Sequence, residues 1–113
     1  MNIKPLALLG ILLMAACAET STEASVQDSI ANVFPDPQDQ AGIAVVVDGS
    51  GPVIFVVHYP DDVTDAEVLS RVQRYCAANG FRSAVPDRVR AGADLIQPDN
   101  SIRESRRGDY TCV

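Results

Sequence analysis

Apolar and polar residues alternate in blocks along the chain, and these blocks predict a small α+β domain over residues 41–113. Residues 42–47 and 53–59 are runs of mostly β-branched side chains, separated by the sequence DGSGP. Two such runs around a glycine-rich turn predict a β-hairpin. Because both runs are almost continuously apolar, we expect the hairpin to lie with one face on a helix and little of it exposed.

The covering helix is predicted to begin after Thr64. Residues 64–67, TDAE, have the order of a capping box, in which Thr and Glu side chains cap free backbone amides. The apolar residues that follow at helical spacing on one face are Val68, Leu69, Val72 and Cys76. The sequence NG at residues 79–80 predicts a left-handed helix end, with Phe81 placed for the apolar contact that often follows.

The pattern weakens after this helix. Residues 81–85 predict a third strand, which Pro86 should end because proline cannot donate a ladder hydrogen bond. We expect a turn, a short strand near Leu95 and a loop at PDNS, and the final DYTCV has strand character. The order β-β-α-β-β is typical of an α+β fold with one helix packed on a small antiparallel sheet.

A polar segment precedes this domain. Residues 17–40 are rich in Ser, Thr, Gln, Asp and Pro, which predicts a flexible tether with a stiffer, proline-containing end. A short helix over residues 25–33 is compatible with the pattern, because three apolar residues share one helical face. They are Val26, Ile30 and Val33.

The start of the chain has the plan of an export signal. Lys4 precedes an apolar run of eleven residues from Leu6 to Ala16. This run is too short to cross a bilayer, which needs about 20 residues. It matches the apolar region of a secretory signal, with a basic residue before it and small residues at its end. We therefore expect export, with residues 1–16 as the signal peptide.

The sequence MAAC at residues 14–17 resembles the lipobox of bacterial lipoproteins, although Met14 stands where leucine is commonest. The resemblance implies cleavage before Cys17, a diacylglycerol on its thiol and an acylated amino group. It further implies an outer-membrane location facing the periplasm, because Ala18 is not the aspartate that commonly retains lipoproteins in the inner membrane. Alternatively, an ordinary signal peptidase reads residues 16–18 as a small-x-small site and releases a soluble protein.

With Cys17 assigned to the anchor, Cys76 and Cys112 form an even pair in an exported chain, which predicts a structural disulfide. A redox-active pair usually has C-x-x-C spacing, which is absent here. The sequences RVQRYCAANGFRSA and GDYTC also resemble a pattern in small proteobacterial lipoproteins, in which a helix ends in cysteine and a late strand carries aromatic-x-cysteine. That resemblance implies a fold and a location, with no activity attached.

Charge divides the chain into two halves. Residues 17–67 contain ten acidic and no basic residues, whereas residues 68–113 contain eight arginines and five acidic residues. The acidic half argues against a nucleic-acid partner. The candidate anion contact in the other half consists of Arg103, Arg106 and Arg107. For these three arginines the alternative is a solvated turn, which we favour. For the two halves as a whole, either the arginine-rich half meets an anionic partner or the halves attract each other within the fold, which we favour.

Catalytic and metal-binding patterns are sparse. The single histidine, His58, has no set of zinc ligands at a suitable spacing and no nucleophile motif to serve. Four acidic residues within 61–67 lack the order of a calcium loop, and the helix dipole accounts for acids at that position. We expect no catalytic residue, cofactor or metal.

Together these features predict a cell-envelope lipoprotein, a non-enzymatic structural or interaction module that is tethered to a membrane through Cys17. Its further partner would be an envelope protein. The alternative is a soluble periplasmic ligand-binding protein released by ordinary signal-peptide cleavage.

Overall fold

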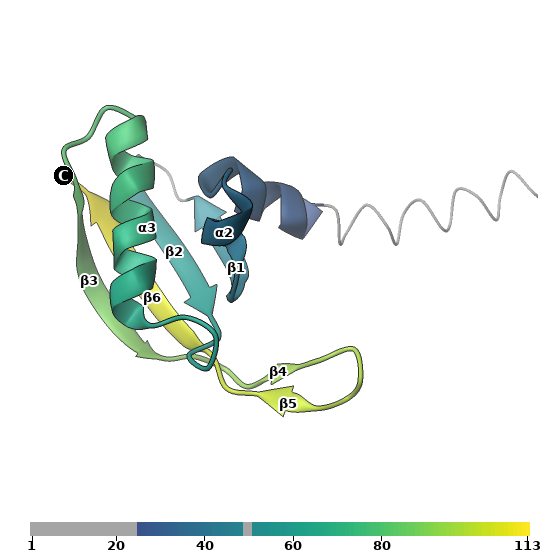
Figure 1. Cartoon of the computed structure of the whole chain (residues 1–113). Coiled ribbons are helices and arrows are strands. Elements are labelled where there is room, and N and C mark those ends of the chain that lie inside the picture. Colours follow the sequence, from purple (N-terminus) through teal and green to yellow (C-terminus); the bar gives the residue numbers. More distant parts are fainter. Residues whose placement is uncertain (1–24, 49–50) are drawn as a thin grey trace, which may run out of the picture.

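The computed structural model describes residues 25–48 and 51–113. Within this part of the chain, four strands form an antiparallel sheet in the order β1-β2-β6-β3, and helix α3 packs on one face (Figure 1). The elements are α2 (Pro37–Gln40), β1 (Ile43–Asp48), β2 (Val53–His58), α3 (Asp65–Ala78), β3 (Ala84–Ala91), β4 (Leu95–Ile96), β5 (Ile102–Arg103) and β6 (Arg106–Cys112). The predicted α+β class and the β1–β2 hairpin are confirmed, and the short strand near Leu95 is β4.

Both ends of α3 have the backbone caps that the sequence predicts, whereas Phe81, predicted to make an apolar contact there, is 39 % exposed. The Thr64 hydroxyl accepts a hydrogen bond from the Glu67 amide at 3.1 Å and donates one to the Glu67 carboxylate at 3.1 Å. At the other end the Phe81 amide donates to the Cys76 carbonyl at 3.0 Å, and Gly80 takes a φ of 91°. Glycine adopts this left-handed conformation without the steric cost that a Cβ brings.

The core lies between α3 and the inner face of the sheet. Val68, Val72 and Cys76 are fully buried on one face of α3, against Ile54 and Val56 of β2. Burying one such aliphatic side chain contributes about 1.5–3 kcal/mol. Since the helix covers only this face, alternate strand residues on the other face stay open to solvent.

The exposure of the hairpin differs from the prediction. Val45 is 37 % exposed and Val47 is 51 % exposed, because both lie on the face of β1 opposite to α3. An antiparallel sheet tolerates one solvated face. The apolar run therefore does not indicate burial on both sides.

Strand β3 also differs from the prediction, because it starts at Ala84 and passes through Pro86 to Ala91. The prediction that Pro86 ends the strand is wrong. The sheet order places β3 at an edge, where proline's missing amide costs no interior ladder bond. A register shift between Pro86 and Arg88 leaves Asp87 as an extra residue in a bulge.

The segment predicted as a flexible tether differs over residues 25–40. Residues 25–33 are helical, as the shared apolar face suggested. Ile30, Val33 and Phe34 are 2 %, 4 % and 1 % exposed and belong to the core. The packed part of the chain therefore begins ahead of residue 41, since these three side chains anchor an otherwise polar segment.

Candidate functional site

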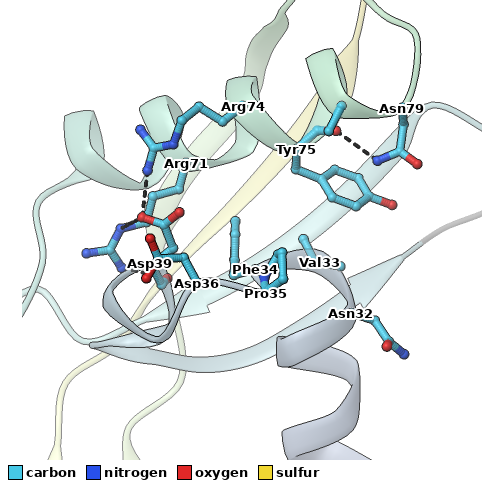
Figure 2. A pocket seen from close by; sticks show the side chains of 11 residues that line it. Asn32, Val33, Phe34, Pro35, Asp36, Asp39, Arg71, Arg74, Tyr75 and Asn79 are labelled. Atoms are coloured by element: carbon cyan, nitrogen blue, oxygen red, sulfur yellow. Dashed lines mark hydrogen bonds and ion pairs between the residues drawn. The ribbon is translucent and has the colours of Figure 1, made fainter.

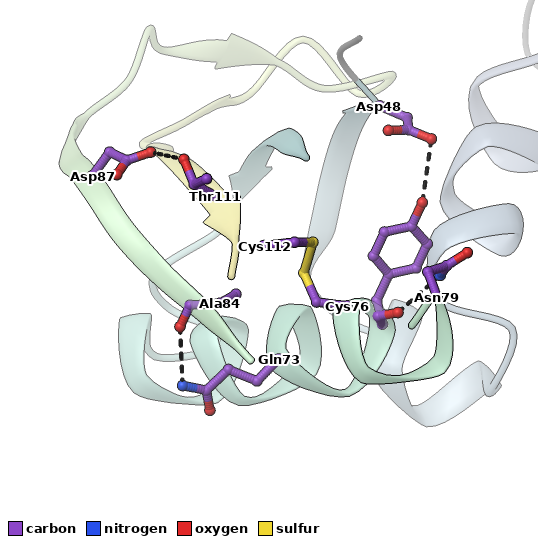
Figure 3. The surroundings of a disulfide bond; sticks show 9 residues. Asp48, Gln73, Cys76, Asn79, Ala84, Asp87, Thr111 and Cys112 are labelled. Atoms are coloured by element: carbon purple, nitrogen blue, oxygen red, sulfur yellow. Dashed lines mark hydrogen bonds between the residues drawn. A yellow bond between two sulfur atoms is a disulfide. The ribbon is translucent and has the colours of Figure 1, made fainter. Parts of the chain in front are cut away.

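A disulfide joins Cys76 of α3 to Cys112 at the end of β6, as predicted (Figure 3). The two Cα atoms are 5.4 Å apart, and 36 residues separate the cysteines in sequence. Both side chains are buried in the core. The bridge fixes the last strand to the helix. The third cysteine, Cys17, and its expected lipidation lie outside the described residues.

Hydrogen bonds on either side of the bridge tie the same end of α3 to two further strands (Figure 3). The Tyr75 hydroxyl donates to the Asp48 carboxylate of β1 at 3.2 Å, and the Gln73 amide donates to the Ala84 carbonyl of β3 at 3.3 Å. Burial raises the pKa of Tyr75, and the nearby Asp48 carboxylate raises it further. The disulfide and the two hydrogen bonds thus hold this end of α3 to β6, β1 and β3.

The three arginines of the predicted anion contact lie in β5 and β6, and each has an acidic partner. Arg103 is 3.0 Å from Asp62, and Arg106 is 2.8 Å from Asp65. Arg107 is 3.4 Å from Asp109 and also lies over the Phe55 ring. Since adjacent strand residues point to opposite faces, Arg106 and Arg107 cannot form one patch.

Most of the described ion pairs join the acidic half of the chain to the arginine-rich half. Asp62 and Asp65 pair with Arg103 and Arg106, and Asp39 pairs with both Arg71 and Arg74. This arrangement agrees with the interpretation that the halves attract each other within the fold. Exposed pairs of this kind contribute about 0–1 kcal/mol each.

His58 belongs to a polar cluster where α3 begins, in which Asp65 and Arg106 are partly exposed. The His58 side chain is fully buried, and Nε2 is 3.1 Å from Asp65 Oδ1, an ion-pair distance without the alignment of a hydrogen bond. Asp65 Oδ1 also accepts from Arg106 Nε at 2.8 Å. Among the described residues, neither His58 Nδ1 nor the buried Tyr110 hydroxyl has a hydrogen-bond partner.

Burial shifts the pKa values in this cluster. It lowers the pKa of His58; Asp65 opposes this shift, while Arg106 adds to it. Burial also raises the pKa of Tyr110 to about 12. The imidazole is therefore neutral near pH 7, and the phenol keeps its proton. In the described part of the chain, His, Cys, Asp and Glu side chains form no group of three that could hold a metal ion.

The free energy of unfolding should fall as the pH drops below about 6.5, the pKa of an unfolded histidine. The pKa of His58 is lowered in the folded protein. At pH values between that lowered pKa and 6.5, the folded protein therefore binds fewer protons than the unfolded chain. Acid in this window therefore favours the unfolded state. Urea unfolding at a series of pH values between 7.5 and about 5 measures the effect.

His58→Gln is the matched control for this pH dependence, because His58 is the sole histidine of the sequence. The variant should show a flatter profile over the same range. A wild-type protein that becomes more stable as the pH falls from 7 to about 5.5 would contradict the assignment of a lowered pKa to His58.

A groove runs between residues 32–36 and the second half of α3 (Figure 2). Its volume is about 280 Å³. Its walls are mainly apolar, from Phe34, Pro35, Tyr75 and Ala78, and charged side chains lie at one end.

Arg71 and Arg74 position the wall of this groove that lies opposite α3. Arg74 Nη2 donates to Asp39 Oδ1 at 2.6 Å (Figure 2). Arg71 Nη1 donates to the carbonyls of Asp39 and Ala41 at 2.9 and 2.7 Å. The sequence pattern does not predict that these two arginines share Asp39 as a partner. More than thirty residues separate them from Asp39 in sequence.

No helix in the described residues is long and apolar enough to cross a membrane. Comparisons with protein-family models, with curated proteins and with solved structures found no match for the chain.

Proposed function

We propose that this protein is a lipid-anchored protein of the bacterial cell envelope, and that its α+β domain is a non-enzymatic interaction module. The observation that carries the proposal is the division of the three cysteines. Cys76 and Cys112 are joined to each other. Cys17 remains, at the end of an apolar run and in the order that a lipobox requires.

The disulfide supports an oxidising location for the domain. Such bridges persist in secreted and periplasmic proteins and are rare where cellular thiols keep cysteines reduced. Both sulfur atoms of the bridge are buried in the core. This favours a structural bridge over a redox centre, because reactive cysteines are partly exposed.

The surface of the domain supports binding rather than chemistry. His58 is buried, and its nearest acidic partner, Asp65, is already bound by Arg106. The groove, at about 280 Å³, lies just below the range of about 300–1,000 Å³ typical of small-molecule sites. Its mainly apolar walls are suited to protein side chains.

The mass of the mature protein tests the lipid anchor. Expressed in a bacterium with an outer membrane, the chain should yield a membrane-bound protein that begins at Cys17 and carries a diacylglycerol and an acyl chain. Cys17→Ala should remove the lipid mass. An unlipidated protein that begins at Glu19 would instead support the soluble ligand-binding alternative and overturn the proposal.

A further inference from the structure

Helix α3 is held on the sheet differently at its two ends. Its last turns are fixed to β6 by the Cys76–Cys112 disulfide. Its start is fixed by charged and polar side chains, because Asp65, the first residue of α3, contacts His58 of β2 and Arg106 of β6. Figure 1 shows this start beside the end of β2 and the β4–β5 hairpin, with the C-terminus at the opposite end of the helix. A covalent bond thus holds one end of α3, and ionisable groups hold the other.

His58 lies where a proton is poorly accommodated. It is the last residue of β2, paired with Ile43 of β1 and Arg106 of β6, and its side chain is fully buried. Among the described residues, neither ring nitrogen has a hydrogen-bond partner. A buried charge is costly unless it is paired and hydrogen-bonded. The closed fold therefore favours the neutral imidazole.

The charges around His58 oppose a proton more than they favour it. Asp65 favours the protonated form, but burial outweighs this effect, and Arg106 of β6 and Arg71 of α3 oppose it. The positive end of the α3 dipole adds to the cost. The Asp65 carboxylate is also engaged, since both its oxygens accept from Arg106 Nε, at 2.8 and 3.1 Å. The other titratable side chain that this ion pair acts on is Tyr110 of β6, which stays neutral because burial raises its pKa to about 12.

The charged residues on the adjoining segments do not act on His58. In the segment that joins β2 to α3, Asp62 pairs with Arg103 of β5 at 3.0 Å, and Asp61 is exposed. Neither carboxylate is among the charges that shift the pKa of His58. Asp48, the charged residue of β1, lies at the far end of that strand. The response of this end to pH therefore depends on His58 and the three charged side chains that act on it.

The ion pair beside His58 is open to water. The side chains of Asp65 and Arg106 are 45 % and 33 % exposed. The buried imidazole therefore lies only one side chain away from solvent. Partly exposed ion pairs contribute little to stability. Opening this end should thus require less free energy than unfolding the whole domain, as is usual for local openings.

We propose that the His58 cluster, defined as His58, Asp65 and Arg106, is an acid-sensitive switch that opens one end of the domain. Protonation of His58 separates the start of α3 from β2 and β6, because the charged imidazole is better accommodated in contact with water. The disulfide keeps the other end of the helix on the sheet, so the domain opens locally instead of unfolding. This inference goes beyond the proposed function and does not depend on lipidation of Cys17.

The β4–β5 hairpin should respond to the same opening. Arg103 of β5 lies 4.0 Å above the Tyr59 ring and is 3.0 Å from Asp62, so the hairpin rests on the segment that joins β2 to α3. At its base, immediately before β6, the Ser105 carbonyl accepts from the Gly92 amide at 2.9 Å. An isolated two-stranded hairpin is marginal in water. Displacement of its support should therefore loosen the hairpin and change the surface that the domain presents in acid.

Hydrogen exchange of the purified full chain, followed amide by amide by NMR, tests the inference. Each reporter amide donates a backbone hydrogen bond: Val63, Val68 and Gly92 report on the His58 end, and Asn79 and Cys112 report on the disulfide end. Protection factors, which correct for the effect of pH on intrinsic exchange, are compared at pH 7.5 and 5.5. Histidine is the side chain that titrates in this range, and the chain contains one histidine.

Protection at the His58 end should fall by about threefold or more between pH 7.5 and 5.5. The limit is about tenfold for one proton whose pKa is about 6.5 in the open form. Protection at the disulfide end should change by less than about twofold, because that end stays closed. Equal falls at both ends would indicate global unfolding and overturn the inference. So would unchanged protection, or protection that rises in acid as protonated His58 forms an ion pair with Asp65.

His58→Gln should abolish this response to acid, because glutamine does not titrate. Asp62→Asn is the matched control, since it removes an acidic residue at the same end of the domain. Asp62 is 45 % exposed, as Asp65 is, and it pairs with Arg103 instead of Arg106. The Asp62→Asn protein should keep the response. A His58→Gln protein with the full response, or an Asp62→Asn protein without it, would overturn the role of His58.

Asp65→Asn provides a second test that leaves His58 in place. Arg106 then loses its ion pair, so protection at the His58 end should be about threefold lower than in wild type already at pH 7.5, with the disulfide end unchanged. The fall on acidification should be at least as large as in wild type, because the group that favours the proton is gone. Wild-type protection at the His58 end of this variant would overturn the inference.

Discussion

Replacing Cys76 and Cys112 by alanine should lower the free energy of unfolding by about 4 kcal/mol, because the bridge closes a 36-residue separation in the unfolded chain. Domains of this size have about 5–15 kcal/mol in total. The loss is therefore a large share of the stability. Urea unfolding of the purified protein, followed by circular dichroism, should show a much lower midpoint and a steeper slope, because the unfolded chain without the bridge is less compact and exposes more surface.

Reduction of the wild-type protein provides the control for this prediction. Reduced wild type keeps both sulfur atoms in the core, so its midpoint reports the bridge apart from any lost packing. The midpoint of the reduced wild type should fall most of the way to the midpoint of the double variant. Reductant should not change the midpoint of the double variant, which has no bridge to reduce. Equal midpoints for oxidised and reduced wild type would contradict a stabilising role for the bridge.

The sequence predicts the features whose causes are local. The capping residue Thr64, the helix-ending Gly80 and the pairing of the neighbouring strands β1 and β2 depend on residues close in sequence, and the structure has all three features in place. The disulfide was also predictable, because parity leaves only one partner for Cys76 once Cys17 is set apart.

Features that depend on the position of an element in the sheet were not predictable. Pro86 breaks a central strand but is tolerated at an edge, and only the strand order shows that β3 is an edge. Likewise Phe34 stands in a polar, proline-containing segment whose average composition indicates a tether. Its burial depends on α3, which lies more than thirty residues later in the chain.

The candidate binding surfaces were the least visible in the sequence. The run of Arg103, Arg106 and Arg107 suggested one cationic patch, but strand alternation and acidic partners separate these side chains. The groove brings Phe34 close to Ala78, and the pairing of the two-residue strands β4 and β5 leaves Ile96 and Ile102 exposed. The groove in particular depends on contacts between residues far apart in the sequence.

Gly108→Ala should destabilise the domain by about 1–3 kcal/mol, the usual cost of overpacking a core, and Gly108→Val by more. A Cβ at Gly108 would lie 2.5 Å from Tyr110 Cε2 and 2.6 Å from Cζ, and the ring also contacts it through its hydroxyl. Tyr110 is 1 % exposed, so it cannot move away. Without this contact Gly108→Ala should stabilise the domain, because alanine in a strand interior is more favourable than glycine by about 0.5–1 kcal/mol.

A double-mutant cycle with Tyr110→Leu isolates this contact. Tyr110→Leu alone should destabilise the domain by leaving a cavity above Gly108. In the Tyr110→Leu background, Gly108→Ala should lower the free energy of unfolding only slightly or raise it, because the added methyl group enters that cavity. The coupling free energy, from urea unfolding of the four proteins, should then exceed about 1 kcal/mol. A Gly108→Ala protein as stable as wild type, or additive effects in the cycle, would show that Tyr110 does not require glycine beneath its ring.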